Sequence, residues 1–244
     1  MVGLLRDALS ASGLPAPRIA YLGAASGDDA GFFRRLSSLL QQAGARDVVL
    51  ARTCGRGASW RESAQAALAQ ADAVFVSGGD VDAGMRALAA AGVIPALQER
   101  FAAGVPFLGL SAGSIMLGRE WITWDDPDDD ATARPFTCLG FAPLICDTHA
   151  EDDDWSELRA LLALRPVGTR GYGVTAPAML RVHPDGRVEA FGGDVACLAN
   201  TADGVRFIDA GALYPRLAAA EQSGRARAPH THLHNGLPGT QNPL

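Results

Sequence analysis

The sequence has little of what marks several classes of protein. Only four of its 244 residues are cysteine, and these are widely scattered and form no C-x-x-C pair. This pattern is typical of reduced, mostly buried thiols in a cytoplasmic protein. No apolar run approaches the roughly 20 residues of a membrane-spanning helix. The first residues carry Arg6 and Asp7 and no long apolar stretch, so a signal peptide is not expected either.

Positive charge is also scarce. Lysine and arginine number 21 against 27 aspartates and glutamates, which gives a net charge of −6, and no basic cluster is present. Because phosphate contacts need such clusters, no nucleic-acid partner is expected. The remaining composition, 48% hydrophobic and 20% charged, is that of an ordinary globular protein with a sizeable core.

Strand-like and helical patterns alternate through the first half of the chain. Helices are predicted at 31–44 and 59–72, where apolar or alanine residues recur at helical spacing. Short apolar runs predict buried parallel strands at 18–26, 47–51, 73–80 and 105–110. This alternation is typical of βαβ units, so the predicted fold class is α/β, with a doubly wound, mostly parallel sheet and helices on both faces.

The last third of the chain has a different pattern. Residues 177–193 contain two short strand-like runs joined by Pro184-Asp185-Gly186, a hairpin signal, and further short strands follow. We therefore expect antiparallel edge strands near the C-terminus. No linker divides the chain before about residue 222, which predicts a single α/β domain over 1–222. The aperiodic residues 223–244 are predicted to form a flexible tail.

One serine lies at the predicted junction of a strand and a helix. The sequence G-L-S-A-G, residues 109–113, fits the G-x-S-x-G pattern of a nucleophile elbow, in which glycines let backbone and side chain approach closely. Ser111 is then exposed at the carboxyl edge of the sheet, where open α/β folds bind ligands. The Ala112 amide, at the positive end of the helix, stabilises an oxyanion. The alternative is a tight turn in which Ser111 only caps the helix.

A glycine pair ends the neighbouring predicted strand. In S-G-G-D, residues 77–80, the Gly79 amide is the expected second oxyanion donor. Gly78 and Asp80 face the same cleft and are the expected substrate-binding residues. The alternative is an ordinary loop that uses glycine for a positive φ.

A serine nucleophile needs a base, and the chain has five histidines. Three lie in the predicted tail, and His183 precedes Pro184 in the predicted hairpin, where a solvated turn residue is expected. His149, after the apolar run L-I-C, is the remaining candidate, although a histidine at a strand end can also be structural. The acid that orients it is left open among four carboxylates, Glu120, Asp125, Asp126 and Asp147.

Together these residues resemble the peptidase E and cyanophycinase family of serine peptidases, whose fold is similar to that of class I glutamine amidotransferases. The resemblance rests on S-G-G-D at 77–80, G-L-S-A-G-S at 109–114 and D-T-H at 147–149, in the family's order and spacing. It extends from about residue 18 to residue 210.

The resemblance implies a role for each of these residues. Ser111 is the expected nucleophile and His149 the base, and the amides of Gly79 and Ala112 form the oxyanion hole. Asp126 is the first choice for the acid, because it matches one position proposed for the family's acid. The expected activity is a serine peptidase that hydrolyses short peptides, as a dipeptidase or exopeptidase, through an acyl-enzyme.

The chain also departs from the family's pattern. Asp80 stands where members tend to carry Asn or Gln, and the run at 173–177 lacks the carboxylate that members often place there. Basic residues that help members hold an acidic substrate after the histidine are replaced by the acidic run 151–154. An acidic rim favours a substrate amine or a basic side chain over a carboxylate.

Two other functions remain open at this stage. One is a ligand-binding relative of the same fold that has lost turnover. The other is an esterase-type acyl hydrolase, which the short interval from Ser111 to His149 and the absence of an HGGG motif disfavour. No cofactor and no metal are expected, although His230, His232 and His234 alternate in the tail. The expected partner is a short peptide, with no nucleic acid and no membrane, and a homodimer is left open.

Overall fold

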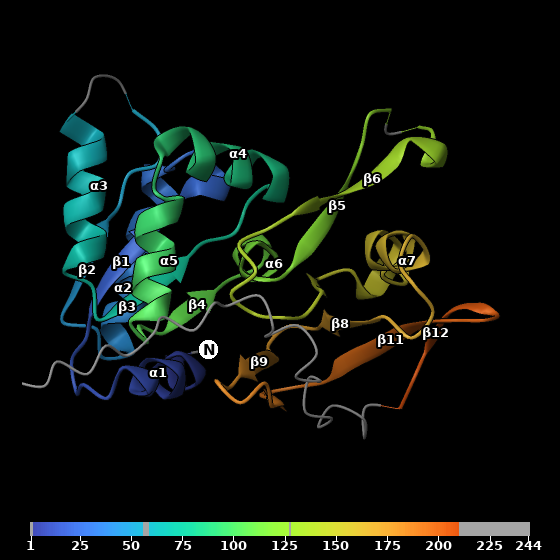
Figure 1. Ribbon diagram of the computed structural model, residues 1–244. Helices are drawn as coiled ribbons and strands as arrows, with labels where there is room; N and C mark the ends of the chain where they lie inside the picture. Colours follow the sequence, from blue (N-terminus) through green and yellow to red (C-terminus); the bar gives the residue numbers. More distant parts are fainter. Residues whose placement is uncertain (1, 56–58, 127, 210–244) are drawn as a thin grey trace, which may run out of the picture.

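The computed structural model describes residues 2–55, 59–126 and 128–209 (Figure 1). The end of the predicted domain at residue 222, the predicted tail and its three histidines therefore lie outside the described residues. No helix among the described residues is long and apolar enough to cross a membrane.

A four-stranded parallel sheet forms the N-terminal half of the molecule. Its strands lie in the order β2-β1-β3-β4. They are β1 (Arg18–Leu22), β2 (Asp47–Leu50), β3 (Ala73–Val76) and β4 (Phe107–Gly109). All three neighbouring pairs are parallel. Because parallel strands begin at the same edge, β3 and β4 also end together, and their loops meet there.

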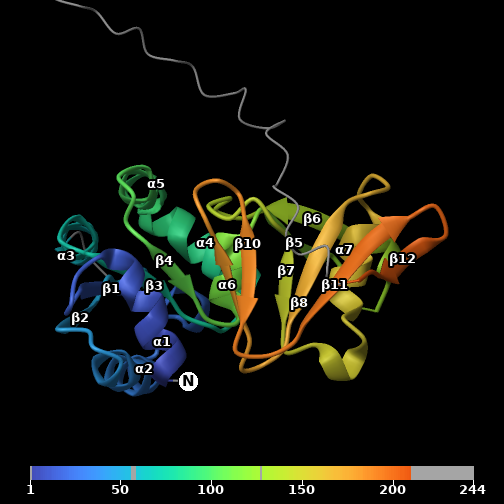
Figure 2. The ribbon, with the colours of Figure 1, turned by 90° about the horizontal axis from the view of Figure 1, so that it is seen from below.

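Helices cover both faces of this sheet. On one face Tyr21 of β1 packs with Leu40 of α2. On the other face Leu22 packs among side chains that include Leu68 of α3 and Leu97 of α5. Figure 2 shows the two layers on opposite sides of the strands. The helices are α1 (Val2–Leu9), α2 (Ala30–Gln42), α3 (Ser59–Ala69), α4 (Val81–Ala91), α5 (Ile94–Ala102), α6 (Ala112–Leu117) and α7 (Ser156–Ala163), with 3-10 turns η1 (Ser10–Ser12), η2 (Ala24–Ser26), η3 (Asp130–Thr132) and η4 (Glu151–Asp153).

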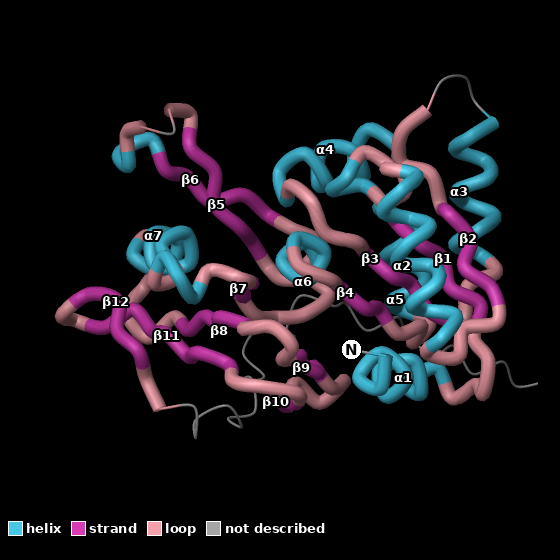
Figure 3. The backbone as a smooth tube through the Cα atoms, turned by 180° about the vertical axis from the view of Figure 1, so that it is seen from behind, coloured by secondary structure: helices cyan, strands magenta, loops and turns pink. Residues whose placement is uncertain are grey.

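The C-terminal half contains a second sheet and two hairpins (Figure 3). The second sheet has the order β12-β11-β8-β7, in which only β7 and β8 are parallel. Its strands are β7 (Cys146–Thr148), β8 (Arg170–Val174), β11 (Val195–Thr201) and β12 (Gly204–Phe207), and the hairpins are β5 (Glu120–Trp124) with β6 (Ala133–Thr137) and β9 (Met179–Val182) with β10 (Val188–Phe191).

The structure confirms the predicted α/β class, the helices on both faces and the antiparallel strands near the C-terminus. The antiparallel strands β11 and β12 hydrogen-bond through β8 to β7 instead of extending the parallel sheet at β4. Several predicted strands are also shorter than expected. The run 73–80 leaves the sheet after Val76, because the backbone of the glycine pair turns away.

Candidate active site

Ser111 lies in a strained turn between β4 and α6. Its backbone has φ 53° and ψ −127°, a region that residues other than glycine rarely occupy. Hydrogen bonds fix this conformation: the Ser114 amide donates to the Ser111 carbonyl (2.7 Å), and the Leu110 amide donates to Val76 of β3 (2.9 Å). The Ser111 side chain makes no capping hydrogen bond to α6. The geometry is therefore that of a nucleophile elbow, and the capping alternative is wrong.

Two glycines make this turn possible. A Cβ atom at Gly113 would lie 2.1 Å from the carbonyl oxygen of Val76, and one at Gly109 would lie 2.5 Å from the Cα atom of Ser114. Both approaches are to backbone atoms, which cannot move aside as a flexible side chain can. The small residues around Ser111 therefore allow the elbow to pack against β3.

The glycine pair after β3 lies directly beside Ser111. A Cβ atom at Gly78 would be 3.0 Å from the Ser111 Cβ and 3.5 Å from its Oγ. Gly79 has φ 142°, and its own Cβ would lie 2.0 Å from the Ala25 carbonyl oxygen. The sequence places these residues on adjacent strands, and the structure brings the loop and the serine together as predicted.

Two amides at this position are available to a ligand. Within the described part of the chain, neither the Gly79 amide nor the Ala112 amide donates a hydrogen bond to a protein acceptor. Asp80, in contrast, is engaged: its Oδ1 accepts from the Ala83 amide at 2.6 Å and caps α4. The expected oxyanion donors are thus free, and the carboxylate of Asp80 helps to fix their loop.

His149 follows the carboxyl end of β7. It has φ 63°, its side chain is exposed, and its amide donates to the Val174 carbonyl at 3.5 Å. Helix α6 packs against β7, and the chain leaving α6 is tied to the start of β7, where the Arg119 amide donates to Leu144 (2.9 Å). No hydrogen bond joins the His149 ring to Ser111 among the described residues.

Electrostatics link the His149 segment to the glycine loop. Burial raises the pKa of Glu157, and the carboxylates of Asp153 and Asp80 raise it further. Glu157 in turn is one of the carboxylates that raise the pKa of Asp147. The Asp80 carboxylate in the loop after β3 and the Glu157 carboxylate of α7 therefore repel each other.

The four candidate acids occupy very different environments. Glu120 forms ion pairs with Arg165 and Arg119, and Asp125 pairs with Arg134. Asp126 lies in the turn that joins β5 to β6.

The carboxylate of Asp126 is exposed, and its Oδ1 accepts from the Asp128 amide at 3.1 Å. No hydrogen bond or ion pair joins Asp126 to His149 among the described residues, so its predicted role stays a prediction. Asp147 is the exception among the four, because its side chain is only 3% exposed.

Two contributors to the site are missing from the sequence prediction. They are Ala25 of η2, whose carbonyl oxygen accepts from the Asp80 amide (2.9 Å), and Glu157 of α7. The small residues after β1 are a signal of close backbone approach that could have identified the first. The second depends on how α7 packs, which local sequence does not specify.

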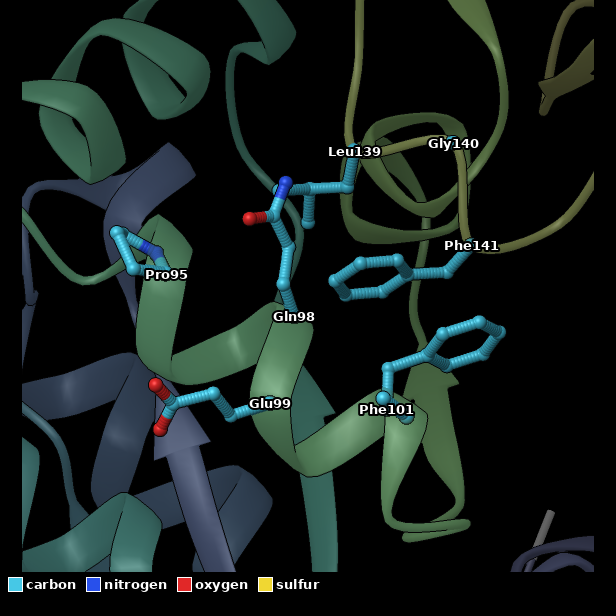
Figure 4. A pocket seen from close by; sticks show the side chains of 8 residues that line it. Pro95, Gln98, Glu99, Phe101, Leu139, Gly140 and Phe141 are labelled. Atoms are coloured by element: carbon cyan, nitrogen blue, oxygen red, sulfur yellow. The ribbon is translucent and has the colours of Figure 1, made fainter. Parts of the chain in front are cut away.

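A pocket elsewhere on the molecule is separate from this site. It lies between α5 and the loop before β7, where the stacked rings of Phe101 and Phe141 form part of its wall and Gln98 projects toward it (Figure 4). None of its lining residues is a predicted site residue. Among the described residues, no group of three metal-ligating side chains occurs.

The fold and the elbow define a class of protein. A strained serine between a parallel strand and a helix, beside a glycine loop with free amides, is the arrangement of an α/β serine hydrolase. The chain belongs to Peptidase family S51, whose family model matches residues 4–187. The protein is therefore a serine peptidase, and the resemblance inferred from the motifs is confirmed.

Solved structures share this fold. A peptidase from an acI-B1 Actinobacterium matches with a TM-score of 0.62 at 16% identity, covering 86% of this chain and 88% of that one. A putative peptidase E protein from Listeria monocytogenes EGD-e matches with a TM-score of 0.53 at 13% identity, covering 85% and 92%. No curated protein matches the chain significantly in sequence.

Proposed function

We propose that the protein hydrolyses short peptides in the cytoplasm, as a dipeptidase or another exopeptidase, through an acyl-enzyme on Ser111. The observation that carries the proposal is the backbone of Ser111, which is held at φ 53° and ψ −127° while its hydroxyl caps nothing. Strain of this kind persists only where the surrounding structure fixes it, and it is concentrated at functional sites.

The reaction follows from the residues around the hydroxyl. His149 takes the proton of Ser111 as Oγ attacks the peptide carbonyl. The amides of Gly79 and Ala112 stabilise the oxyanion, and Gly78 leaves room for the substrate beside the serine. The protonated His149 then gives its proton to the leaving amine, and water releases the acyl group by the reverse sequence.

The charge around the site indicates which substrates it accepts. Asp80 ends the glycine loop, its carboxylate interacts with that of Glu157, and the exposed acidic run 151–154 follows His149. Negative charge repels a substrate carboxylate and attracts the α-ammonium group of a short peptide or a basic side chain. A free N-terminus is the group that a dipeptidase or an exopeptidase acting at the N-terminal end has to recognise, which is why we favour this kind of exopeptidase action.

A library of short peptides tests this proposal. We expect hydrolysis of peptides with a free N-terminus, faster for Lys- or Arg-containing peptides than for peptides that begin with Asp, and slower after N-acetylation. The preference should weaken as salt screens the carboxylates. Ser111→Ala is the control for contaminating activity. Faster cleavage of Asp-leading peptides would contradict the assignment of substrate.

One observation favours a second candidate, a ligand-binding relative that has lost turnover. Within the part of the chain that is described, the Ser111 hydroxyl and the His149 ring are not hydrogen-bonded, and an unactivated serine is a weak nucleophile. An active-site phosphonate distinguishes the two functions. An activated Ser111 is labelled, whereas a binding protein binds peptides without being labelled or turning them over.

A further inference from the structure

One buried carboxyl group is left unexplained by the proposed mechanism. Asp147 is 3% exposed, and it is the only buried carboxylate in the part of the chain that the structure describes. It lies in β7 and is followed by Thr148 and then by the expected base, His149. Burial of a carboxylate without a partner is costly, so its retention needs a reason.

The side chain of Trp155 accounts for the burial. Asp147 is paired with Gly173 of the parallel strand β8. A Cβ atom at Gly173 would lie 2.6 Å from the Trp155 ring. Because paired residues of adjacent strands project on the same face, Asp147 lies on the face that this ring covers. Trp155 is itself buried, held by hydrogen bonds from its amide to Ala150 and Asp153.

The carboxyl group has one satisfied oxygen and one that is not. Oδ1 accepts from the Thr148 amide at 2.7 Å, while the buried Oδ2 has no hydrogen-bond partner. The ionisable groups nearby are acidic: burial first, and then the carboxylates of Glu157, Asp153 and Glu151, raise the pKa of Asp147 to about 7. Helix α6, which packs on β7, carries no charged residue.

We propose that Asp147 is the positioning residue of His149. This inference rests on the proposed function and supplies the acid that the mechanism lacks. In the reacting complex the ionised carboxyl accepts a hydrogen bond at Oδ2 from the Nδ1–H group of the His149 ring, which leaves Nε2 free to face Ser111.

The protons balance without transfer to Asp147. Nε2 takes the proton of Ser111 and later gives it to the leaving amine, while Nδ1 keeps its own proton throughout. The carboxylate stabilises the intermediate imidazolium and stays ionised. His149 follows Asp147 by two residues, just past the end of β7, and this role requires its exposed ring to rotate toward the buried oxygen in the reacting complex.

The other candidate acids have different environments. Glu120 and Asp125 are paired with arginines, and Asp126 is exposed in the hairpin turn. Asp147 combines a buried oxygen that lacks a partner with a position two residues before His149, near the end of β7.

The test compares Asp147→Asn with Asp126→Asn and with Asp203→Asn, an exposed carboxylate in the β11–β12 turn that serves as the matched control. Two rates are measured: kcat/KM for a cleaved peptide as a function of pH, and labelling of Ser111 by a phosphonate. We expect Asp147→Asn to lower both by roughly 10²–10⁴-fold, the range known for the loss of triad orientation. Asp203→Asn should match the wild type.

The pH profile separates this role from a structural one. In the wild type both Asp147 and His149 have to lose a proton before the site is active, so log kcat/KM should rise with a slope near two on the acid side. In Asp147→Asn the slope falls to one. Asp147→Glu, which keeps an acid, should recover part of the rate and the steeper slope. A variant that is only misfolded changes the amount of active enzyme and leaves the slope unchanged.

Each result has a defined meaning. Wild-type rates and an unchanged slope in Asp147→Asn overturn this inference while the peptidase proposal stands. Loss of labelling in Asp126→Asn alone assigns the acid to the hairpin instead. Absence of both labelling and hydrolysis in the wild type contradicts the proposed function itself, and this inference with it.

Discussion

At the scale of single residues, the site depends on the absence of side chains as much as on their presence. Ser111 is held where β4 meets α6, and Gly78, Gly109 and Gly113 leave the space that its turn requires. The backbone of β3 is the surface against which this turn packs. A methyl group at Gly109 or Gly113 pushes against backbone atoms that hydrogen bonds and sheet pairing hold in place, and one at Gly78 pushes against the Ser111 Cβ.

The first prediction concerns Gly79 and Gly113. Gly113→Ala places a Cβ atom 2.1 Å from the Val76 carbonyl, and Gly79→Ala places one 2.0 Å from that of Ala25 at a φ of 142°. We expect each variant to lose roughly 1–3 kcal/mol of unfolding free energy and most of its peptidase activity. Urea denaturation and peptide hydrolysis measure the two effects.

Gly3→Ala is the matched control for both variants. A Cβ atom at Gly3 meets nothing within 4 Å, and alanine is favoured in the helix α1. Equal stability of all three variants would show that the close backbone approaches are not real constraints.

At the scale of elements, the β5–β6 hairpin is fastened to the chain that leaves α7. Glu120 of β5 accepts from the Arg165 Nε at 3.0 Å and from its Nη2, and Arg119 adds a third contact. Burial by itself would raise the pKa of Glu120, but the two arginines outweigh it and hold the pKa below its ordinary value. This ion-pair group therefore positions the hairpin relative to the second sheet.

The second prediction follows from that lowered pKa. A group whose pKa is depressed by folding stabilises the fold above its ordinary pKa and loses that contribution as the pH falls through the folded value. Glu120→Gln should therefore cost on the order of 1–3 kcal/mol at pH 7. The deficit should shrink on acidification below pH 4, as thermal unfolding at several pH values would show.

The control for this variant is Glu99→Gln, an exposed position on α5. It removes the same charge without breaking an ion pair, so its unfolding temperature should follow that of the wild type. A deficit of equal size in both variants would assign the effect to net charge and contradict the role of the Arg165 contact.

The sequence predicts the elements whose pattern is local. Strands β1 to β4, the elbow, the β9–β10 hairpin and the antiparallel strands β11 and β12 all follow from apolar runs, glycines and turn residues close together in the chain. The β5–β6 hairpin is missing from the prediction, because Pro135 interrupts β6 and acidic residues fill the connecting turn. Proline and clustered charge are typical of loops, and only pairing with β5 makes this segment a strand.

The candidate site also has one part that the sequence predicts and another that it does not. The alternating pattern predicts a parallel sheet whose loops meet at one edge, and the pairing of β3 with β4 brings Gly78 and Gly79 beside Ser111. The surroundings of the carboxylates depend on contacts across the fold, such as the Trp155 ring over Gly173 and the Arg165 pair with Glu120. Four acids that look equivalent in the sequence therefore become distinguishable only in three dimensions.

At the scale of the whole molecule, the proposed site contains acidic groups whose burial and mutual repulsion disfavour the folded state. The net charge is −6, and the carboxylates of η4 and α7 surround the buried Asp147. Function and stability consequently pull in opposite directions at this position, because the ionised form that would orient His149 is the form that burial disfavours.

The third prediction tests that conflict through the pH dependence of stability. The pKa of Asp147 rises from 3.8 to about 7 on folding, so between these values the folded protein holds a proton that the unfolded chain has released. Folding therefore becomes less favourable as the pH rises through this interval. Asp147→Asn should be more stable than the wild type at pH 8, by on the order of 2–4 kcal/mol, and about equal to it at pH 4.

Denaturant titrations at the two pH values measure this difference. Asp203→Asn again serves as the control, since its carboxylate is exposed and should show no such dependence. A lower stability of Asp147→Asn at pH 8 would mean that the ionised carboxylate has a partner in the folded protein, contrary to the unpaired Oδ2.

The most direct test of the central claim is to label the protein with an active-site phosphonate and map the modified residue by mass spectrometry. The control is Ser114→Ala, which removes the next hydroxyl along α6. We predict a single phosphonylated residue, Ser111, in the wild type and in Ser114→Ala, and no labelling in Ser111→Ala. Modification of another serine, or none while peptides are still hydrolysed, would contradict the assignment of Ser111 as the nucleophile.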